Sequence, residues 1–236
     1  MEETHKRLIQ AEKLASIGKL AATIAHEIRN PLTSVKLNIQ KVLEDDRLEA
    51  LEKEHLAITQ EGIGQIEKFV KELLNFTRVS ELQLARFPVS QILEESVKMM
   101  ADCFRQKMIA IERKVDDGLP EVFVDGDKMR QVFLNVLRNA CEAVDQNGKI
   151  TISATLAGED RAKKIRVRIS DNGCGIPDKD WENIFEPFFT TKPSGFGLGL
   201  ANARKIVEQH KGTIRVVKKR SAGTTFEIFI PCEGEP

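Results

Sequence analysis

The sequence lacks an excess of charge of either sign. It holds 36 lysines and arginines against 36 aspartates and glutamates, so its formal net charge is zero. Coating nucleic acid or an anionic membrane depends on summed positive charge, so neither is expected as its main task. No apolar run is long enough to cross a bilayer, and residues 1–20 carry charges throughout, without the apolar core of a signal peptide. These absences predict a cytoplasmic protein with no nucleic-acid partner and no membrane contact of its own.

Cysteine is also scarce, and its spacing excludes two further classes. The sequence has four, Cys103, Cys141, Cys174 and Cys232, which lie far apart and never in C-x-x-C spacing. Such a pattern suggests neither a zinc site nor a disulfide framework. We therefore expect reduced thiols, most of them buried.

The composition is that of a foldable chain long enough for two ordinary domains. Its 236 residues are 41% hydrophobic and 31% charged, which excludes collagen-like and wholly disordered proteins. We assign residues 1–85 to a helical domain and residues 86–236 to a second domain of mixed strands and helices. The predicted fold class is therefore α+β.

Residues 1–85 carry two stretches with apolar side chains at helical spacing. They run from Leu8 to Leu43 and from Leu48 to Leu74, on either side of the acidic break Glu44–Arg47. The pattern predicts an antiparallel helical hairpin. Two helices cannot bury their apolar stripes on both sides, so we expect two copies to form a dimeric four-helix bundle. A bundle completed within one chain is the alternative.

Residues 86–236 alternate between strand-like and helical patterns. The expected strands are Ile109–Val115, Val122–Val124, Lys149–Leu156, Lys164–Ser170, Thr213–Lys218 and Thr224–Ile230. The expected helices are Ser90–Gln106, Asp127–Val144 and Leu198–His210. This order predicts an α/β sandwich, a mixed sheet with a layer of helices on one face.

The helix expected from Asp127 carries polar side chains on one face. Asn135, Asn139 and Glu142 recur at i, i+4 and i+7, away from the apolar stripe. A single asparagine there would simply be solvated. Paired amides with a carboxylate, however, are hard oxygen donors suited to Mg²⁺ held against phosphates.

Two glycine-rich stretches follow. Asp171 to Gly175 comes directly after an expected strand, where a carboxylate can accept a hydrogen bond from an exocyclic amine and glycines let the backbone approach a flat ring. Gly195 to Gly199 leads into a helix and can present amide N–H groups to a phosphate. The second stretch matches neither a Walker A loop nor a dinucleotide fingerprint. The alternatives are an ordinary turn and a lid without a ligand.

His26 and Glu27 lie in the middle of the first expected helix. The stretch resembles the zinc pattern H-E-x-x-H, but Asn30 stands where the second histidine would be, so a zinc site is excluded. A lone helical histidine is usually structural. Pro31 lacks an N–H and crowds the carbonyl of Glu27, so we expect a bend beside His26. Such a bend suits an imidazole that another domain must reach.

Taken together, these stretches resemble a sensor histidine kinase over essentially the whole chain. In chain order they look like an H box at His26–Leu32, an N box at Asn135–Ala140, a first glycine box at Asp171–Gly175, an F box at Phe185–Phe189, a second glycine box at Gly195–Gly199 and a closing threonine strand at Gly223–Phe226. Motifs in the right order are far more specific together than any one alone. The short lid Thr190–Pro193 looks most like the nitrogen-regulation type, with Phe196 as a departure where threonine is usual.

The resemblance implies an ATP-binding fold shared with DNA gyrase, the mismatch-repair ATPase and the large heat-shock chaperone. ATP and Mg²⁺ would be the cofactors. By position, Asp171 would receive the adenine amino group, Gly173 and Gly175 would line the base pocket, and Thr225 would support the adenine contact. Asn139 would ligate Mg²⁺, with Asn135 nearby on the phosphates.

The resemblance also implies a phosphate-binding lid. Lys192 and the amides of Gly197 and Gly199 would stabilise the triphosphate, and Gly195 would form part of the same lid. These assignments are carried over from the family position by position.

The activity that the resemblance implies is phosphoryl transfer. His26 would attack ATP with Glu27 orienting its other ring nitrogen, and a response-regulator receiver domain would accept the phosphoryl group. Asn30 would orient water for the reverse phosphatase reaction, and residues 1–85 would form the homodimer. The chain is also compatible with the cytoplasmic part of a longer, membrane-anchored sensor. A clamp-type ATPase and a non-catalytic scaffold that binds a regulator are the rival functions.

Overall fold

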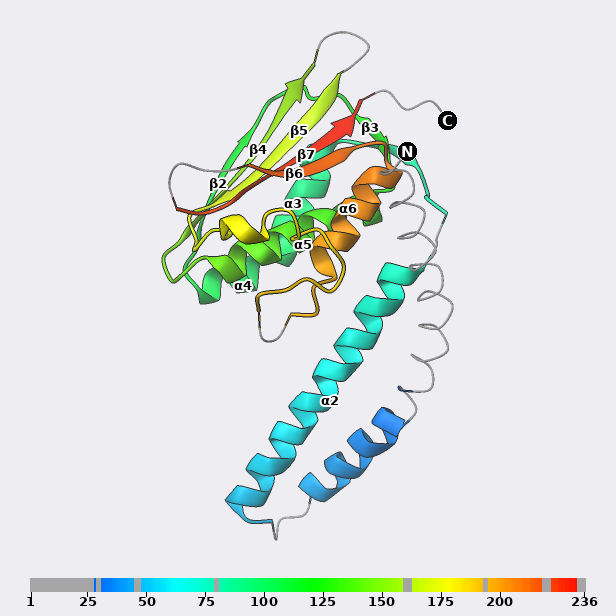
Figure 1. Cartoon of the computed structure of the whole chain (residues 1–236), viewed down its shortest axis with the longest axis vertical. Helices are drawn as coiled ribbons and strands as arrows, with labels where there is room; N and C mark the ends of the chain where they lie inside the picture. Colours follow the sequence, from blue (N-terminus) through cyan, green and yellow to red (C-terminus); the bar gives the residue numbers. More distant parts are fainter. Residues whose placement is uncertain are drawn as a thin grey trace. The chain divides into compact units, whose positions relative to one another are not determined.

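The computed structural model describes Ile28 and residues 31–44, 48–78, 81–158, 163–192, 195–217 and 222–232 (Figure 1). The chain forms two compact units. The first comprises Met1–Ser80 with Lys192–Phe196, and the second comprises Glu81–Thr191 with Gly197–Pro236. The described part of the first unit is mainly helical, and the second unit is built around a sheet.

The described residues of the first unit form two helices. Residues 31–43 are helical, and α2 spans Ala50–Thr77. A capping box starts α2, in which the backbone N–H of Glu49 donates to the Glu52 carboxylate at 3.0 Å. An ion pair of 2.8 Å between Lys36 and Glu67 joins the two helices. The two-helix prediction is confirmed for these residues, whereas the first part of the expected helix from Leu8 lies outside the described residues.

Apolar side chains on both helices of the first unit stay exposed. Val35 and Val42 recur seven residues apart in the helix 31–43, and Leu51, Ile58 and Ile66 recur at intervals of seven and eight in α2. This spacing places each set along one helix face. The unit therefore carries an apolar stripe that this chain's described residues leave in contact with solvent.

The second unit is built around a five-stranded mixed sheet. Its order is β2 (Ala110–Val115), β4 (Lys149–Ala157), β5 (Lys164–Asp171), β7 (Thr225–Pro231) and β6 (Thr213–Val217). The β2–β4 pair is parallel, and the other three pairs are antiparallel. Every second residue of β5, from Ile165 to Asp171, is buried, as expected for a sheet with one covered face.

Helices cover that face of the sheet (Figure 1). They are α3 (Val89–Met99), α4 (Ala101–Gln106), α5 (Gly126–Ala143) and α6 (Gly199–Gln209), and a short 3₁₀ turn spans Asp178–Asp180. The apolar stripe of α5 is completely buried, with Val132, Phe133, Val136 and Leu137 at 0% exposure. The predicted sandwich of a mixed sheet and a helical layer is confirmed.

Three details of the second unit differ from the expectation. The helix predicted over Ser90–Gln106 is divided at Met100, and this break lets both Met100 and Phe104 face the core. The strand Val122–Val124, labelled β3, does not join the large sheet but pairs with β1 (Ala85–Phe87). Helix α5 starts one residue early, because the side chain of Asp125 accepts from the N–H of Lys128 at 3.1 Å and so caps the helix.

The prediction of reduced cysteines was wrong for two of the four. Cys103 of α4 and Cys141 of α5 form a disulfide across 38 residues of chain. Chain spacing could not reveal this bond, because the packing of two helices brings the two sulfurs together. Cys174 and Cys232 lie outside this disulfide, and Cys174 is exposed rather than buried.

No helix within the described part of the chain is both long and apolar enough to cross a membrane.

Candidate functional site

The loop after β5 fixes a buried carboxylate. Asp171, the last residue of β5, is 2% exposed. Its Oδ1 accepts from the N–H of Gly173 at 2.9 Å and from the N–H of Thr224 at 3.0 Å. Because two amides hold one oxygen, the orientation of the whole carboxylate is set by the backbone.

Close backbone packing surrounds this loop. A Cβ on Gly173 would lie 2.3 Å from the carbonyl oxygen of Ala143, and the N–H of Cys174 donates to that same oxygen at 3.1 Å. On the other side, a Cβ on Gly223 would lie 2.1 Å from the carbonyl oxygen of Asp171. Glycine is therefore required at both positions, and the loop is held between the end of α5 and the turn before β7.

The two threonines of the closing strand take different positions. The hydroxyl of Thr225 lies 2.8 Å from the hydroxyl of Ser170. The residue that reaches the Asp171 carboxylate is Thr224, through its N–H. The role of Thr225 at the adenine stays a prediction, and Thr224 was not among the residues selected from the sequence. Because Thr224 makes its contact through the backbone, its side-chain type could not have revealed it.

Asn135 links α5 to the start of α6. Its Nδ2 donates to the carbonyl oxygen of Gly199 at 3.0 Å, so the two predicted motifs meet. Asn139 lies one turn further along α5 and is half-buried. At the N-cap of helix α6, Leu198, no side chain makes a capping hydrogen bond. The backbone N–H groups of the first turn are therefore left without a side-chain cap. A helix N-terminus of this kind suits an anion.

Gly197 holds the turn before α6 against the F-box segment. Its φ is +68°, and a Cβ there would lie 2.5 Å from the backbone of Phe188 and Phe189. The N–H of Phe188 also donates to the Gly197 carbonyl at 3.0 Å. Gly175 likewise adopts a positive φ of +77° in the Asp171 loop.

Five further residues were predicted to belong to the site. Lys192 and Gly195 belong to the first unit, where the N–H of Gly195 donates to the Lys192 carbonyl at 3.2 Å. His26, Glu27 and Asn30 lie outside the described residues, as does the expected bend beside them.

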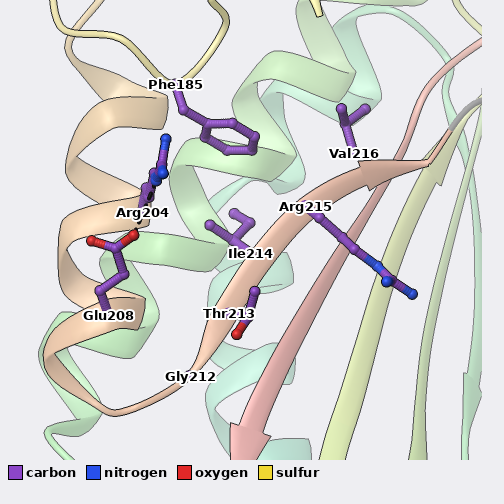
Figure 2. A pocket seen from close by; sticks show the side chains of 8 residues that line it. All are labelled: Phe185, Arg204, Glu208, Gly212, Thr213, Ile214, Arg215 and Val216. Carbon is purple, nitrogen blue, oxygen red and sulfur yellow. Dashed lines mark hydrogen bonds and ion pairs between the residues drawn. The ribbon is translucent and has the colours of Figure 1, made fainter. Parts of the chain in front are cut away.

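The second unit also holds a pocket of about 320 Å³ between α6 and the edge strand β6 (Figure 2). Figure 2 shows Arg204 paired with Glu208 at 3.0 Å, and the Arg204 guanidinium lies 5.9 Å from the centre of the Phe185 ring. Among the motifs identified in the sequence, the F box contributes Phe185 to this pocket, and none of the proposed nucleotide-binding residues lines it. The pocket is therefore separate from the loop of Asp171.

Family models match both parts of the chain. Residues 16–82 match the model of the His Kinase A (phospho-acceptor) domain. Residues 124–234 match that of the histidine kinase-, DNA gyrase B-, and HSP90-like ATPase. A crystal structure of histidine kinase ThkA in complex with response regulator protein TrrA matches with 31% identity and a TM-score of 0.68, over 99% of this chain and 67% of that one. The chain belongs to the sensor histidine kinases.

Curated sensor kinases are also similar to this chain over most of its length. The signal transduction histidine-protein kinase AtoS of Escherichia coli is 35% identical over 98% of this chain and 37% of its own length. The sensor histidine kinase ZraS of the same species is 35% identical over 93% of this chain and 46% of its own length. This kinase chain thus spans less than half of these curated relatives. A crystal structure of ShkA in complex with AMPPNP has a TM-score of 0.76, with 26% identity, over 92% of this chain and 46% of that one.

The second unit of this kinase fits a nucleotide. Asp171 is a buried carboxylate held by two amides, and Gly173 leaves no Cβ between the loop and α5. The start of α6, with no side-chain cap, lies on Asn135. A base acceptor and an anion-binding helix end are the two features that a nucleoside triphosphate requires.

Proposed function

We propose that this chain transfers the γ-phosphoryl group of ATP to His26 and then to an aspartate of a response-regulator receiver domain. The observation that carries the proposal is the presence in one chain of a phospho-acceptor domain, whose matched range contains His26, and an ATPase domain. The structure of ThkA in complex with its response regulator protein TrrA supports a receiver domain as partner. ATP is available in the cytoplasm, where the proposal places the reaction.

The proposed nucleotide site begins with the base. Asp171 accepts a hydrogen bond from the adenine amino group, and Gly173 and Gly175 line the pocket beside it. Thr225 was predicted to support this contact. We propose Thr224 as the nearer support, because its N–H holds the Asp171 carboxylate and therefore fixes the direction in which the other oxygen points.

The phosphates would be bound by α5 and by the start of α6, which meet where Asn135 contacts Gly199. Asn139 is the proposed Mg²⁺ ligand, and Asn135 stands beside the phosphates. The amides of Gly197 and Gly199 would stabilise the triphosphate. From the lid segment, Lys192 would add a charge, with Gly195 as part of the same lid. Bound Mg²⁺ would neutralise charge on the leaving diphosphate.

The proposed chemistry at His26 is nucleophilic. A neutral ring nitrogen attacks the γ-phosphorus in line, the bond to the leaving oxygen breaks, and phosphohistidine and ADP result. Glu27 accepts or orients the proton on the other ring nitrogen, which raises the nucleophilicity of the attacking one. Asn30, one turn on, would hold the water that removes the phosphoryl group from the regulator in the reverse reaction.

One contact argues against a clamp-type ATPase. Enzymes of the gyrase kind use a carboxylate as general base at the position that Asn135 occupies here. The amide Nδ2 of Asn135 donates to the Gly199 carbonyl, and an ionised carboxylate could not make that bond because it has no hydrogen to donate. Asn135 thus orders the start of α6 rather than activating water.

The first unit is proposed to act as a homodimer, with residues 1–85 and 86–236 as the working division of the chain. The apolar stripe of Val35, Val42, Leu51, Ile58 and Ile66 is the surface that a second copy would cover. Burial of such a stripe between two hairpins gives the four-helix arrangement.

The test is incubation of the chain with γ-labelled ATP and Mg²⁺, comparing wild type with His26→Gln and Asp171→Asn. We expect a label on wild type that is lost in acid and survives in base, and no label on either variant. Asp171→Asn keeps an oxygen for the amides of Gly173 and Thr224, so its fold should survive while the adenine contact is lost.

The rivals give different results in the same experiment. ATP hydrolysis without labelled protein would favour a clamp-type ATPase. Neither label nor hydrolysis would favour a scaffold. A His26→Gln protein that labels as wild type would remove His26 from the mechanism.

A further inference from the structure

The Cys103–Cys141 disulfide joins the shortest helix of the second unit to the helix that carries Asn135 and Asn139. Cys141, near the end of α5, is completely buried, whereas Cys103 in α4 is only partly covered. Cys103 is therefore the half of the bond that lies nearer to solvent. Nothing in the proposed phosphoryl transfer uses these two sulfurs.

The end of α5 that carries Cys141 is also the support of the Asp171 loop. Ala143 lies two residues after Cys141, and its carbonyl oxygen accepts from the N–H of Cys174 at 3.1 Å. Gly173 packs so closely on this oxygen that no side chain fits between them. A displacement of the α5 end therefore moves the loop directly, since close-packed groups transmit strain.

A polar clamp holds the same helix end to α4. The ammonium of Lys107, the residue after α4, donates to the carbonyl oxygens of Cys141 at 2.8 Å and Val144 at 2.9 Å. With the disulfide, this makes two connections between the α4 region and the end of α5. The ammonium alone would keep the helix ends near each other when the disulfide is open, but without fixing their separation.

We propose that Cys103 and Cys141 form a redox modification site that tunes the Asp171 loop. In the oxidised form the disulfide fixes the α5 end and the loop that rests on Ala143. In the reduced form two thiol sulfurs need more room than two bonded ones, so the α5 end shifts and the loop loosens. The effect on nucleotide affinity rests on the proposed function, whereas the effect on the loop does not.

The reaction is thiol–disulfide exchange with a small thiol. Its thiolate attacks the Sγ of Cys103, the S–S bond breaks, and Cys141 leaves as a thiolate that takes up a proton. A second small thiol attacks the mixed disulfide, which releases the Cys103 thiol and a small-molecule disulfide. Two electrons and two protons enter the protein. Oxidation is the reverse, with the small-molecule disulfide as oxidant.

The first readout is the state of the four cysteines in the full chain. The protein is equilibrated with a glutathione-type disulfide or with its thiol, alkylated, and mapped by mass spectrometry. We expect Cys103 and Cys141 to be alkylated only in the reduced form, whereas Cys174 and Cys232 carry either the alkyl group or the small thiol after oxidation. Alkylation of all four cysteines after oxidation would overturn the proposal.

The second readout is the loop itself. Amide hydrogen exchange at Gly173 and Cys174 should be about fivefold faster in the reduced form, and the dissociation constant of a non-hydrolysable ATP analogue should rise about fivefold. In Cys103→Ser both values should stay at the reduced level in either buffer. Cys232→Ser, the control, should respond to redox conditions as wild type does.

Two outcomes contradict the coupling. Equal loop exchange in the oxidised and reduced forms would show that the bond does not govern the loop. A redox response that persists in both Cys103→Ser and Cys103→Ala would assign it to another group. If Asp171→Asn binds the analogue as wild type does, the proposed nucleotide site fails, and the exchange rates at Gly173 and Cys174 still decide the redox proposal.

Discussion

The two units of this kinase bury their apolar side chains in opposite ways. In the first, Ile39, Ile63, Val70 and Phe76 are buried, while Val35, Val42, Leu51, Ile58 and Ile66 stay exposed along helix faces. In the second, one continuous core runs from Val89 to Ile230 through every helix and the large sheet. The second unit has a core complete within one chain, whereas the first leaves a stripe exposed that we propose a second copy covers.

This difference follows from the number of layers in each unit. A sheet with a helical layer buries the apolar face of every element within one chain. A two-helix hairpin has only one internal contact, so the apolar side chains on its outer faces need a partner. Self-association should therefore be sensitive to the first unit, and stability of the fold to the second.

The largest expected effect is on dimerisation. Ile66→Glu places one carboxylate from each copy in the stripe, and burying unpaired charges there should raise the dimer dissociation constant by about a thousandfold. Sedimentation equilibrium measures this constant. Met99→Glu introduces the same charge at an exposed apolar residue of the second unit and should leave the dimer intact. Equal dimerisation of both variants would contradict the proposal that the first unit, and not the second, forms the dimer.

The next effect tests the close packing of the second unit. Gly223→Ala puts a Cβ 2.1 Å from the Asp171 carbonyl at a φ of +103°, and we expect a loss of about 3 to 4 kcal/mol in unfolding free energy. The matched control is Gly118→Ala, with a φ of +74° and open space around the Cβ, which should lose only about 1 kcal/mol. Denaturant titration measures both values. Equal losses would mean that the φ angle alone, and not contact with the loop, makes Gly223 necessary.

The disulfide should contribute a smaller share of the stability of the second unit. It closes a loop of 38 residues, and its loss in Cys103→Ser should lower the unfolding free energy of oxidised protein by about 2 to 3 kcal/mol. The Lys107 contacts to the same helix end remain and keep the loss at this level. Under reducing conditions wild type and variant should unfold alike. A persistent difference there would show that the serine itself, rather than the missing bond, is responsible.

The smallest effect is a pH dependence from Glu112. Hydrogen bonds from Lys149 first, then Lys114 and Thr151, lower the pKa of this carboxyl from 4.5 to about 2. A lowered pKa in the folded state stabilises the fold fully above pH 4.5, and this contribution is lost as the pH falls toward about 2.

Thermal unfolding at several pH values between 2 and 6 checks this contribution. Glu112→Gln should flatten the decline slightly, because the side chain of Glu112 is partly exposed and solvent screens its ion pairs. The exposed Glu121→Gln is the control. An unchanged pH profile in Glu112→Gln would remove the Lys149 interaction from the account.

Local pattern predicted most elements of both units. The alternation of Ile165, Val167 and Ile169 placed β5, and the stripe of Val132, Val136 and Ala140 placed α5, because each signal is contained in the element that it describes. Gly173, Gly197 and Gly223 were found for the same reason, since they lie within short motifs, whereas the equally close-packed Gly148 and Gly212 lie outside those motifs and were missed.

Features that depend on distant partners were not predictable. The break at Met100 follows from the demand that Phe104 reach the core, and β1 and β3 pair across 35 or more residues. The disulfide depends on helix packing, and the contact of the Thr224 N–H with Asp171 depends on how the turn before β7 meets the Asp171 loop. Each of these is a tertiary relation that no window of sequence contains.

The most direct test of the account is to map where the label from γ-labelled ATP resides. The full chain is labelled with Mg²⁺ present, digested at neutral or basic pH, and each labelled peptide is sequenced by mass spectrometry. The account predicts phosphohistidine on a peptide containing His26, and no label on peptides from residues 86–236. Label on the second unit, or ATP hydrolysis with no labelled peptide at all, would contradict it.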